Sequence, residues 1–201
     1  MGLFLHFSHH NTVFAFPISS CFLVSLHVSS TPLSIKCQTG FFLLGKPKKE
    51  SLKEDYREAL NTFFACRGLP LLSDTAKVDI YLRLKMKNQT VTSTLYDRAK
   101  KTCSYTVEYC DSSGKTQLGD VCCYVHCQDK FVAIMNQFRK VPGCIINYKD
   151  LNLVKHISRV VCSNTFTVVQ LEQLKQICLK VEMCGRNDVY VSRFPNLVER
   201  N

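Results

Sequence analysis

The feature that most constrains the fold is a change of hydrophobic period near residue 76. From Lys77 onward, apolar and polar side chains alternate one by one, which is typical of a β-strand with one buried face. Asn88-Gln89 then forms the expected hairpin turn into a second strand, Thr90–Tyr96. The expected core face carries Val78, Ile80, Leu82, Leu84 and Met86, and the opposite face carries Asp79, Tyr81, Arg83, Lys85 and Lys87.

Short strands of the same kind follow at close intervals through the rest of the chain. One of them, Lys130–Phe138, is apolar on both faces and is expected to be central and covered. Turn residues separate the segments from one another, as between the strands of a small barrel or sandwich. The other strands are expected at Cys103–Cys110, Asp120–Cys127, His156–Cys162, Thr165–Leu171, Gln176–Met183 and Asp188–Pro195.

One helix is predicted ahead of the strands, over residues 51–66. Ser51 and Glu54 have the spacing of a capping box at its start. Gly68 suits the left-handed position after the helix, and Pro70 prevents its continuation. Apolar residues between these ends recur every three or four positions and form one stripe: Leu52, Tyr56, Ala59, Leu60, Phe63 and Phe64.

These patterns predict a mainly β (α+β) fold with one N-terminal helix. The strands are expected to form a small distorted β-barrel or sandwich of about seven to nine short strands. Residues 46–201 are expected to be a single globular domain, with helix 51–66 followed by a barrel over about residues 76–198.

Residues 1–45 differ in composition from the rest. No charged side chain precedes Lys36, and the most apolar run, Cys21–Val28, is followed by two serines. This order resembles a signal peptide, but there is no positive start and Pro17 interrupts the segment. We expect a poorly structured apolar N-terminal extension, with a signal-like segment or a mis-assigned start of the reading frame as the alternatives. No stretch is long and apolar enough for a stable membrane span.

The strand Asp120–Cys127 is the strongest candidate for chemistry, because it contains Cys122, Cys123, His126 and Cys127. Zinc needs about four ligands around one point. On a regular strand Cys122 and His126 share one face, and Cys123 and Cys127 share the other, with about 13 Å within each pair. We therefore expect these residues to pack as a strand, and we predict no metal and no other cofactor.

The remaining chemical signals are weak. The 12 cysteines have no C-x-x-C spacing, and in a chain with an apolar core this favours free thiols in a reducing compartment. No P-loop, dinucleotide fingerprint, nucleophile elbow or paired carboxylate motif occurs. Only His126 and His156 follow the first segment, and neither belongs to a catalytic signature. The sequence predicts no enzyme, no catalytic residue and no small-molecule substrate.

Charge is the more informative property. The net charge is +10, and every charged residue except Lys36 lies at or after Lys46. A basic hairpin face can contact phosphates or an acidic segment, with a tyrosine available for stacking. The alternative is a solvated face that uses Lys and Arg to prevent edge pairing. The candidate partner-binding residues are Tyr81, Arg83, Lys85, Lys87, Arg98, Lys100 and Lys101.

The order of segments in the C-terminal half is distinctive. It runs through YTVEYCDSSGKTQLGDVCCYV, KFVAIMNQF, HISRVVCSNTFTVVQLEQLKQICLKVEM and DVYVSRFPN. This order resembles bromo-adjacent homology (BAH) domains, and residues 46–201 also look like uncharacterised transposable-element-associated proteins of vertebrates, especially fish. The resemblance implies a non-catalytic distorted β-barrel that mediates chromatin or protein contacts. Some such domains use an aromatic cage, which this Trp-free chain does not display in its motifs.

The sequence therefore predicts a non-enzymatic intracellular interaction module, nuclear or cytoplasmic, and the resemblance implies an origin from a transposon. Its expected partners are chromatin, nucleic acid or an acidic protein segment, bound through the basic hairpin. The alternative is a secreted, disulfide-bonded binding protein with a cleaved signal peptide. In that case Asn88-Gln89-Thr90 is a glycosylation acceptor.

Overall fold

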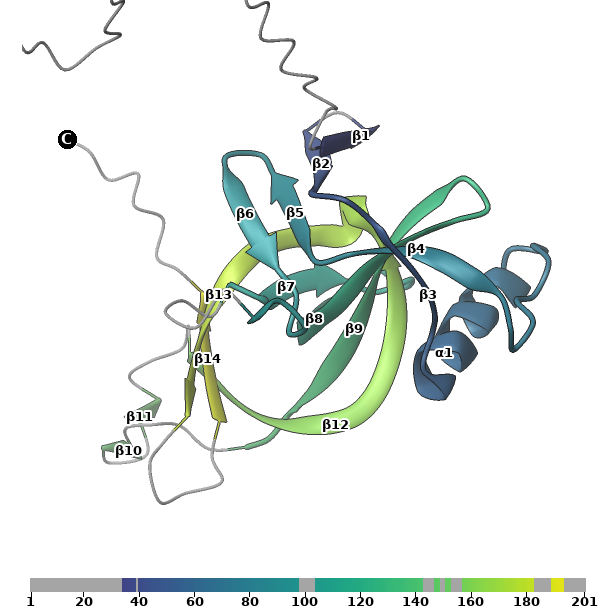
Figure 1. Ribbon diagram of the computed structural model, residues 1–201. Helices are drawn as coiled ribbons and strands as arrows, with labels where there is room; N and C mark the ends of the chain where they lie inside the picture. Colours follow the sequence, from purple (N-terminus) through teal and green to yellow (C-terminus); the bar gives the residue numbers. More distant parts are fainter. Residues whose placement is uncertain are drawn as a thin grey trace, which may run out of the picture. The chain divides into compact units, whose positions relative to one another are not determined.

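The computed structural model describes residues 34–38, 40–97, 104–142, 147–148, 151–152, 157–182 and 189–193 (Figure 1). The helices with described bounds are the α-helix α1 (Glu54–Ala65) and the 3-10 helix η2 (Leu171–Gln173). The strands are β1 (Ser34–Gln38), β2 (Phe41–Leu44), β3 (Lys48–Ser51), β4 (Lys77–Tyr81), β5 (Arg83–Met86), β6 (Gln89–Thr92), β7 (Thr106–Cys110), β8 (Thr116–Cys127), β9 (Lys130–Lys140), β10 (Asn147–Tyr148), β11 (Leu151–Asn152), β12 (Ile157–Gln170), β13 (Leu174–Glu182) and β14 (Val189–Arg193).

Six strands close into a barrel in the order β7-β8-β9-β12-β14-β13, and β13 pairs with β7 to complete the ring (Figure 1). All of these pairings are antiparallel. The long strand β8 also pairs with β4 near its C-terminal end, and β4 pairs with the edge strand β3. The prediction of a small mainly β barrel with one helix is confirmed.

A second, four-stranded sheet in the order β1-β2-β5-β6 packs on one face of the barrel strands. The core between them combines Leu43 and Leu84 of this sheet with Val121, Tyr124 and Met135 of the barrel. Two polar contacts join the layers. The Tyr124 hydroxyl donates to the Val91 carbonyl at 3.2 Å, and the Thr94 amide donates to the Val121 carbonyl at 2.8 Å.

Helix α1 covers the opposite face of β8 and β9. Its apolar stripe buries Leu60, Phe63 and Phe64 against a cluster that includes Cys123 and Ile134. Because the six-carbon rings of both phenylalanines leave water here, burial of this stripe stabilises the helix much more than its intrinsic propensity does.

The helix boundaries differ from the prediction. Ser51 is the last residue of β3, and α1 starts after Lys53 without a side-chain cap bond, so the expected capping box is wrong. The β3–β4 pairing holds Ser51 opposite Lys77 and draws it away from the helix. At the other end, Gly68 takes the expected left-handed conformation with a φ of 65°.

The alternating stretch after residue 76 is also divided. β4 belongs to the barrel sheet, whereas β5 belongs to the four-stranded sheet, and Leu82 lies between them. The hairpin turn is Lys87-Asn88, one residue earlier than expected, because Met86 pairs with Gln89. β9 pairs on both sides, as expected for a central strand.

Two strands of the fold lie before residue 46, where the domain was expected to begin. β1 and β2 form within the segment expected to be an unstructured extension, and β2 contributes the fully buried Leu43 to the core. The folded domain therefore includes residues before Lys46, and the expected signal-like segment lies outside the described residues.

Candidate basic face

The four-stranded sheet carries a row of side chains that points away from the core. Strand register places Lys36 opposite Phe42, Phe42 opposite Lys85, and Lys85 opposite Thr90. Side chains directly opposite on neighbouring strands lie about 5 Å apart at Cβ, so Phe42 has a lysine side chain as its neighbour on each flanking strand. Lys36 and Lys85 are exposed and Phe42 is half-buried. We call Lys36, Phe42, Arg83, Lys85 and Lys87 the basic face.

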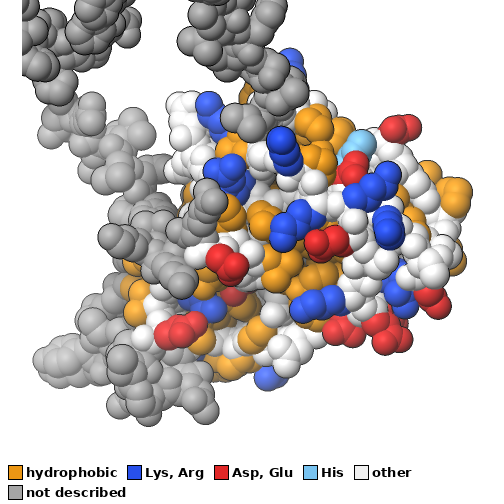
Figure 2. Space-filling model, in the orientation of Figure 1, with side chains coloured by type: hydrophobic (Ala, Val, Ile, Leu, Met, Phe, Trp, Pro, Cys, Tyr) orange, Lys and Arg blue, Asp and Glu red, His pale blue; other side chains and the backbone are white. Residues whose placement is uncertain are grey.

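Two further cations extend this row. Arg83 lies two residues before Lys85 on the same face of β5, and its guanidinium lies 5.2 Å from the centre of the Tyr96 ring. Lys87 is exposed in the hairpin turn with a φ of 54°, a backbone conformation that is uncommon for lysine. No described carboxylate forms an ion pair with Lys36, Lys85 or Lys87. Figure 2 shows Lys and Arg side chains with hydrophobic side chains between them on this side of the molecule.

The seven predicted partner-binding residues do not lie together on one surface. Arg83, Lys85 and Lys87 are brought together on β5 and its turn. Tyr81 is only 1% exposed and lies in the core opposite Tyr124, so its expected role in stacking on a ligand is wrong. The change of sheet after β4 explains this, because it turns Tyr81 inward and Arg83 outward. Arg98, Lys100 and Lys101 lie outside the described residues.

Sequence reasoning missed Lys36 and Phe42. Lys36 is the one charged residue before Lys46, which singles it out in the sequence, but its pairing with β2 depends on tertiary structure. Phe42 lies in the run FFLL, which does not reveal which of its two aromatic residues faces outward. The register with β5 decides this, because Phe42 pairs with Lys85 and Leu43 pairs with the buried Leu84.

The cysteine-rich strand packs as expected but is not regular. A β-bulge between Val121 and Cys123 adds a residue to β8, so Cys122 and Cys123 both join the cluster beneath α1. The expected strict alternation of these two thiols is therefore wrong. His126 lies on the other face, stacked on Phe131 with 4.3 Å between ring centres, and its Nδ1 lies 3.7 Å from Asp79.

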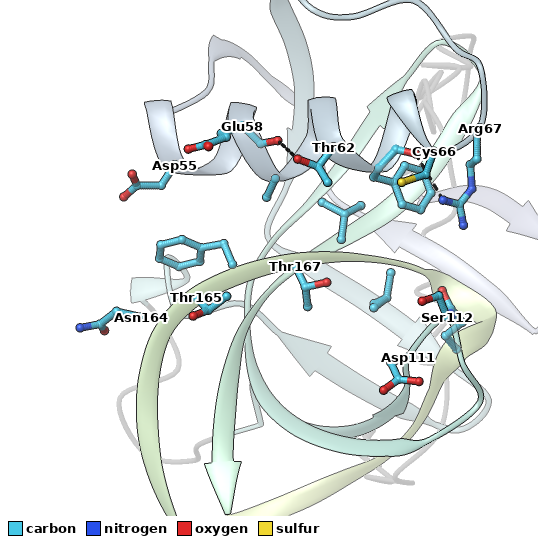
Figure 3. Close-up of a pocket in the computed structure, with 16 residues that line it drawn as sticks. Asp55, Glu58, Thr62, Cys66, Arg67, Asp111, Ser112, Asn164, Thr165 and Thr167 are labelled. Atoms are coloured by element: carbon cyan, nitrogen blue, oxygen red, sulfur yellow. Dashed lines mark hydrogen bonds between the residues drawn. The ribbon is translucent and has the colours of Figure 1, made fainter.

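A groove runs between α1 and β12, with a volume of about 550 Å³. Its floor is formed by apolar groups of Ala59, Phe63, Phe166 and Val168, and Tyr56 packs edge-on against Phe166 at 4.9 Å beside it. Three carboxylates line the rim: Asp55 and Glu58 from α1, and Asp111 from the β7–β8 turn. Figure 3 shows the helix carboxylates on one side of β12 and the Asp111 carboxylate on the other. We call this the acid-rimmed groove.

Local hydrogen bonds hold two of the charged side chains of the groove, Asp111 and Arg67. Asp111 accepts from the Ser113 hydroxyl at 2.6 Å and from the Gln117 amide at 2.9 Å, and these bonds lower its pKa to about 2. The one cationic lining residue, Arg67, lies 3.6 Å from the Phe63 ring centre and donates to the Phe63 carbonyl. Cys66 is exposed in the groove, and none of the described residues that line the groove is a histidine that could pair with this thiol.

A second polar cluster is buried among the barrel strands. The Asp120 carboxylate accepts from the Thr106 hydroxyl at 2.6 Å and pairs with Lys180 Nζ at 3.2 Å. Burial raises the pKa of Asp120, while the Thr106 and Lys180 contacts lower it. Glu108 is likewise buried and accepts from Arg193 at 2.5 Å. The Asp120 and Glu108 carboxylates are thus each paired with a cation and with a neutral donor, Thr106 for Asp120 and Gln176 for Glu108.

The described residues contain no cluster of three or more histidine, cysteine or acidic side chains placed to hold a metal ion. Within the same residues, no helix combines the length and the apolar character that crossing a membrane requires. Comparison with protein-family models, with curated proteins and with solved structures found no match. Function must therefore be argued from the surfaces of this chain alone.

Proposed function

We propose that this protein is a non-enzymatic interaction module that binds a polyanionic partner through the basic face. The partner is chromatin, nucleic acid or an acidic protein segment, and the compartment is the nucleus or the cytoplasm. The observation that carries the proposal is the cross-strand row in which Lys36 and Lys85 flank Phe42. The resemblance of the C-terminal half to bromo-adjacent homology domains favours the same class.

Charge and geometry support this row as a binding surface. Exposed lysines without a described carboxylate partner can contact a ligand directly, whereas an ion-paired lysine has to exchange partners. An aromatic ring between the cations can stack on a base, and such a ring contributes about 1–3 kcal/mol per stacked base. A face that served only to prevent edge pairing would place all its lysines on the outer strands. Lys36 does lie on the outer strand β1, but Lys85 lies on β5, which is paired on both sides.

Charge reversal tests the proposal. The variant Lys36→Glu/Lys85→Glu/Lys87→Glu should bind a fluorescent 20-base-pair DNA duplex and polyglutamate more weakly than the natural chain. The slope of log affinity against log salt should fall by about 3 for the duplex, since each lost phosphate contact removes about one unit. The matched control is Lys115→Glu/Lys130→Glu/Lys175→Glu, which alters three exposed lysines elsewhere. Equal losses in the two variants would refute the proposal.

Replacement of the ring distinguishes the partners. Phe42→Ala should weaken binding of single-stranded DNA by roughly tenfold if bases stack on the ring, because about 1.4 kcal/mol corresponds to tenfold. The same variant should leave polyglutamate affinity nearly unchanged. Loss of polyglutamate binding with unchanged DNA binding would point to an acidic protein segment instead.

A secreted glycoprotein is the second candidate, and one observation favours it. Asn88 is exposed at the tip of the β5–β6 hairpin, where a glycan can be accommodated. A glycan there would lie beside Lys85 and Lys87, so it would compete with the polyanion proposal. A mobility shift after glycosidase treatment, abolished by Asn88→Gln, would support the secreted candidate and contradict the first.

A further inference from the structure

We propose that the acid-rimmed groove binds a short, extended, basic peptide as an added strand on the free edge of β12. This site is separate from the basic face and has the opposite charge. Three properties of the groove specify this occupant: an unpaired strand edge, an apolar floor and an anionic rim.

Among the described strands, one edge of β12 is unpaired over the C-terminal part of the strand. β14 pairs with β12 only from Ile157 to Val160, whereas β9 pairs with the opposite edge of β12 as far as Gln170. Within the described ranges, no strand pairs with the second edge beyond Val160. The groove is lined by this part of β12, from Asn164 to Val169. An extended peptide can therefore take up backbone hydrogen bonds there, as in other cases of strand addition.

The two sides of the groove suit a strand with alternating side chains. Successive residues of an added strand would face alternately towards α1 and towards the β7–β8 turn. Asp55 and Glu58 lie on the first side and Asp111 on the second (Figure 3). Phe166 and Val168 are half-buried and leave apolar surface for the stems of lysine or arginine side chains.

The charge balance selects a basic occupant over an acidic or neutral one. The lining residues include three carboxylates against one guanidinium, and Arg67 already stacks on Phe63. Glu58 is exposed without a described side-chain partner, and Asp55 is exposed in the first turn of α1. Asp111 keeps its charge although it holds the turn, because its bonds come from neutral donors. An acidic peptide would be repelled on both sides of β12.

The test uses the full chain and a labelled hexapeptide of alternating lysine and valine, with a glutamate–valine peptide of equal length for comparison. Only the lysine peptide should bind. The variant Asp55→Asn/Glu58→Gln/Asp111→Asn should weaken its binding at least tenfold, since each screened pair contributes severalfold at most. Asparagine at 111 keeps the acceptor for the turn. The matched control, Glu50→Gln/Asp74→Asn/Asp129→Asn, removes three exposed carboxylates elsewhere and should bind normally.

Hydrogen exchange distinguishes strand addition from charge attraction, because charge attraction alone would not slow the exchange of backbone amides in β12. Binding of the lysine peptide should slow exchange of amides in residues 161–169 and leave β3, another strand edge, unchanged. Thermal unfolding of each variant establishes that it is folded. The proposal is overturned if the lysine peptide fails to bind, if both triple variants weaken it equally, or if the amides of β12 exchange as fast as before.

Discussion

Asp120 and Lys180 form an ion pair that is largely removed from water, with 10% and 15% of their side chains exposed. Lys180 also pairs with Glu182 at 3.1 Å, and its ammonium lies 5.7 Å from the centre of the Phe138 ring. Removing water from two charges is costly, so such a pair stabilises little overall, yet breaking it leaves one charge buried alone. Neither residue was singled out by the sequence, because their separation of 60 positions hides the contact.

Lys180→Met should therefore destabilise the fold by about 3 kcal/mol at pH 7, measured by urea unfolding. Burial already raises the pKa of Asp120 above its ordinary value of 3.8, and loss of Lys180 raises it further. A carboxyl with a raised pKa in the folded state destabilises while it is charged, so the loss should shrink as the pH falls from 7 towards 4.

The double variant Asp120→Asn/Lys180→Met is the control for this pair. It removes both charges and keeps an acceptor for the Thr106 hydroxyl, so it should recover much of the lost stability. A loss below about 1 kcal/mol that is constant with pH would show that water reaches the pair freely.

At the scale of elements, the alternation of apolar and polar residues predicted the strands well, but it did not predict where a strand changes sheet or carries a bulge. The alternation after Lys77 correctly places Val78, Ile80 and Leu84 in the core. The alternation does not reveal that β4 and β5 join different sheets. The apolar and polar residues alternate without a break from Lys77 to Lys87, as they would in one continuous strand. The bulge in β8 could not be predicted from the sequence either, because Cys122 and Cys123 are identical neighbours and their order does not show which of them is the extra residue.

The bulge has a testable chemical consequence. Burial raises the pKa of Cys123 to about 12, and it also raises the pKa of Cys122, so both thiols should resist alkylation at pH 7.5 in the native protein. Cys66 and Cys162 are exposed and should be modified first. Mass spectrometry of peptides after timed iodoacetamide treatment measures each site.

Denaturation in urea provides the control, because unfolding should make all four thiols react at similar rates. Early modification of Cys122 in the native protein would mean that this residue faces solvent and that the helix does not cover it. Early modification of Cys66 alone would contradict the exposed position of Cys162.

At the scale of the whole molecule, the chain separates its charges. The basic face lies on the four-stranded sheet, and the acid-rimmed groove lies between α1 and β12. The net charge of +10 predicted only the first of these. The groove could not be predicted from composition. Its three carboxylates, at residues 55, 58 and 111, come from two separate elements and gather only in the folded chain. The barrel itself was predictable because many short alternating segments have few other ways to bury their apolar faces.

Lysine acetylation footprinting tests the polyanion proposal most directly. The chain is bound to the DNA duplex, or to polyglutamate, at about 50 mM salt and is treated briefly with an acetylating reagent. Lys36, Lys85 and Lys87 should be protected several-fold relative to the free chain, while Lys115 and Lys130, which are exposed elsewhere, should be acetylated as before. Equal acetylation of all five lysines in the bound and free protein, or protection confined to Lys115 and Lys130, would contradict the account.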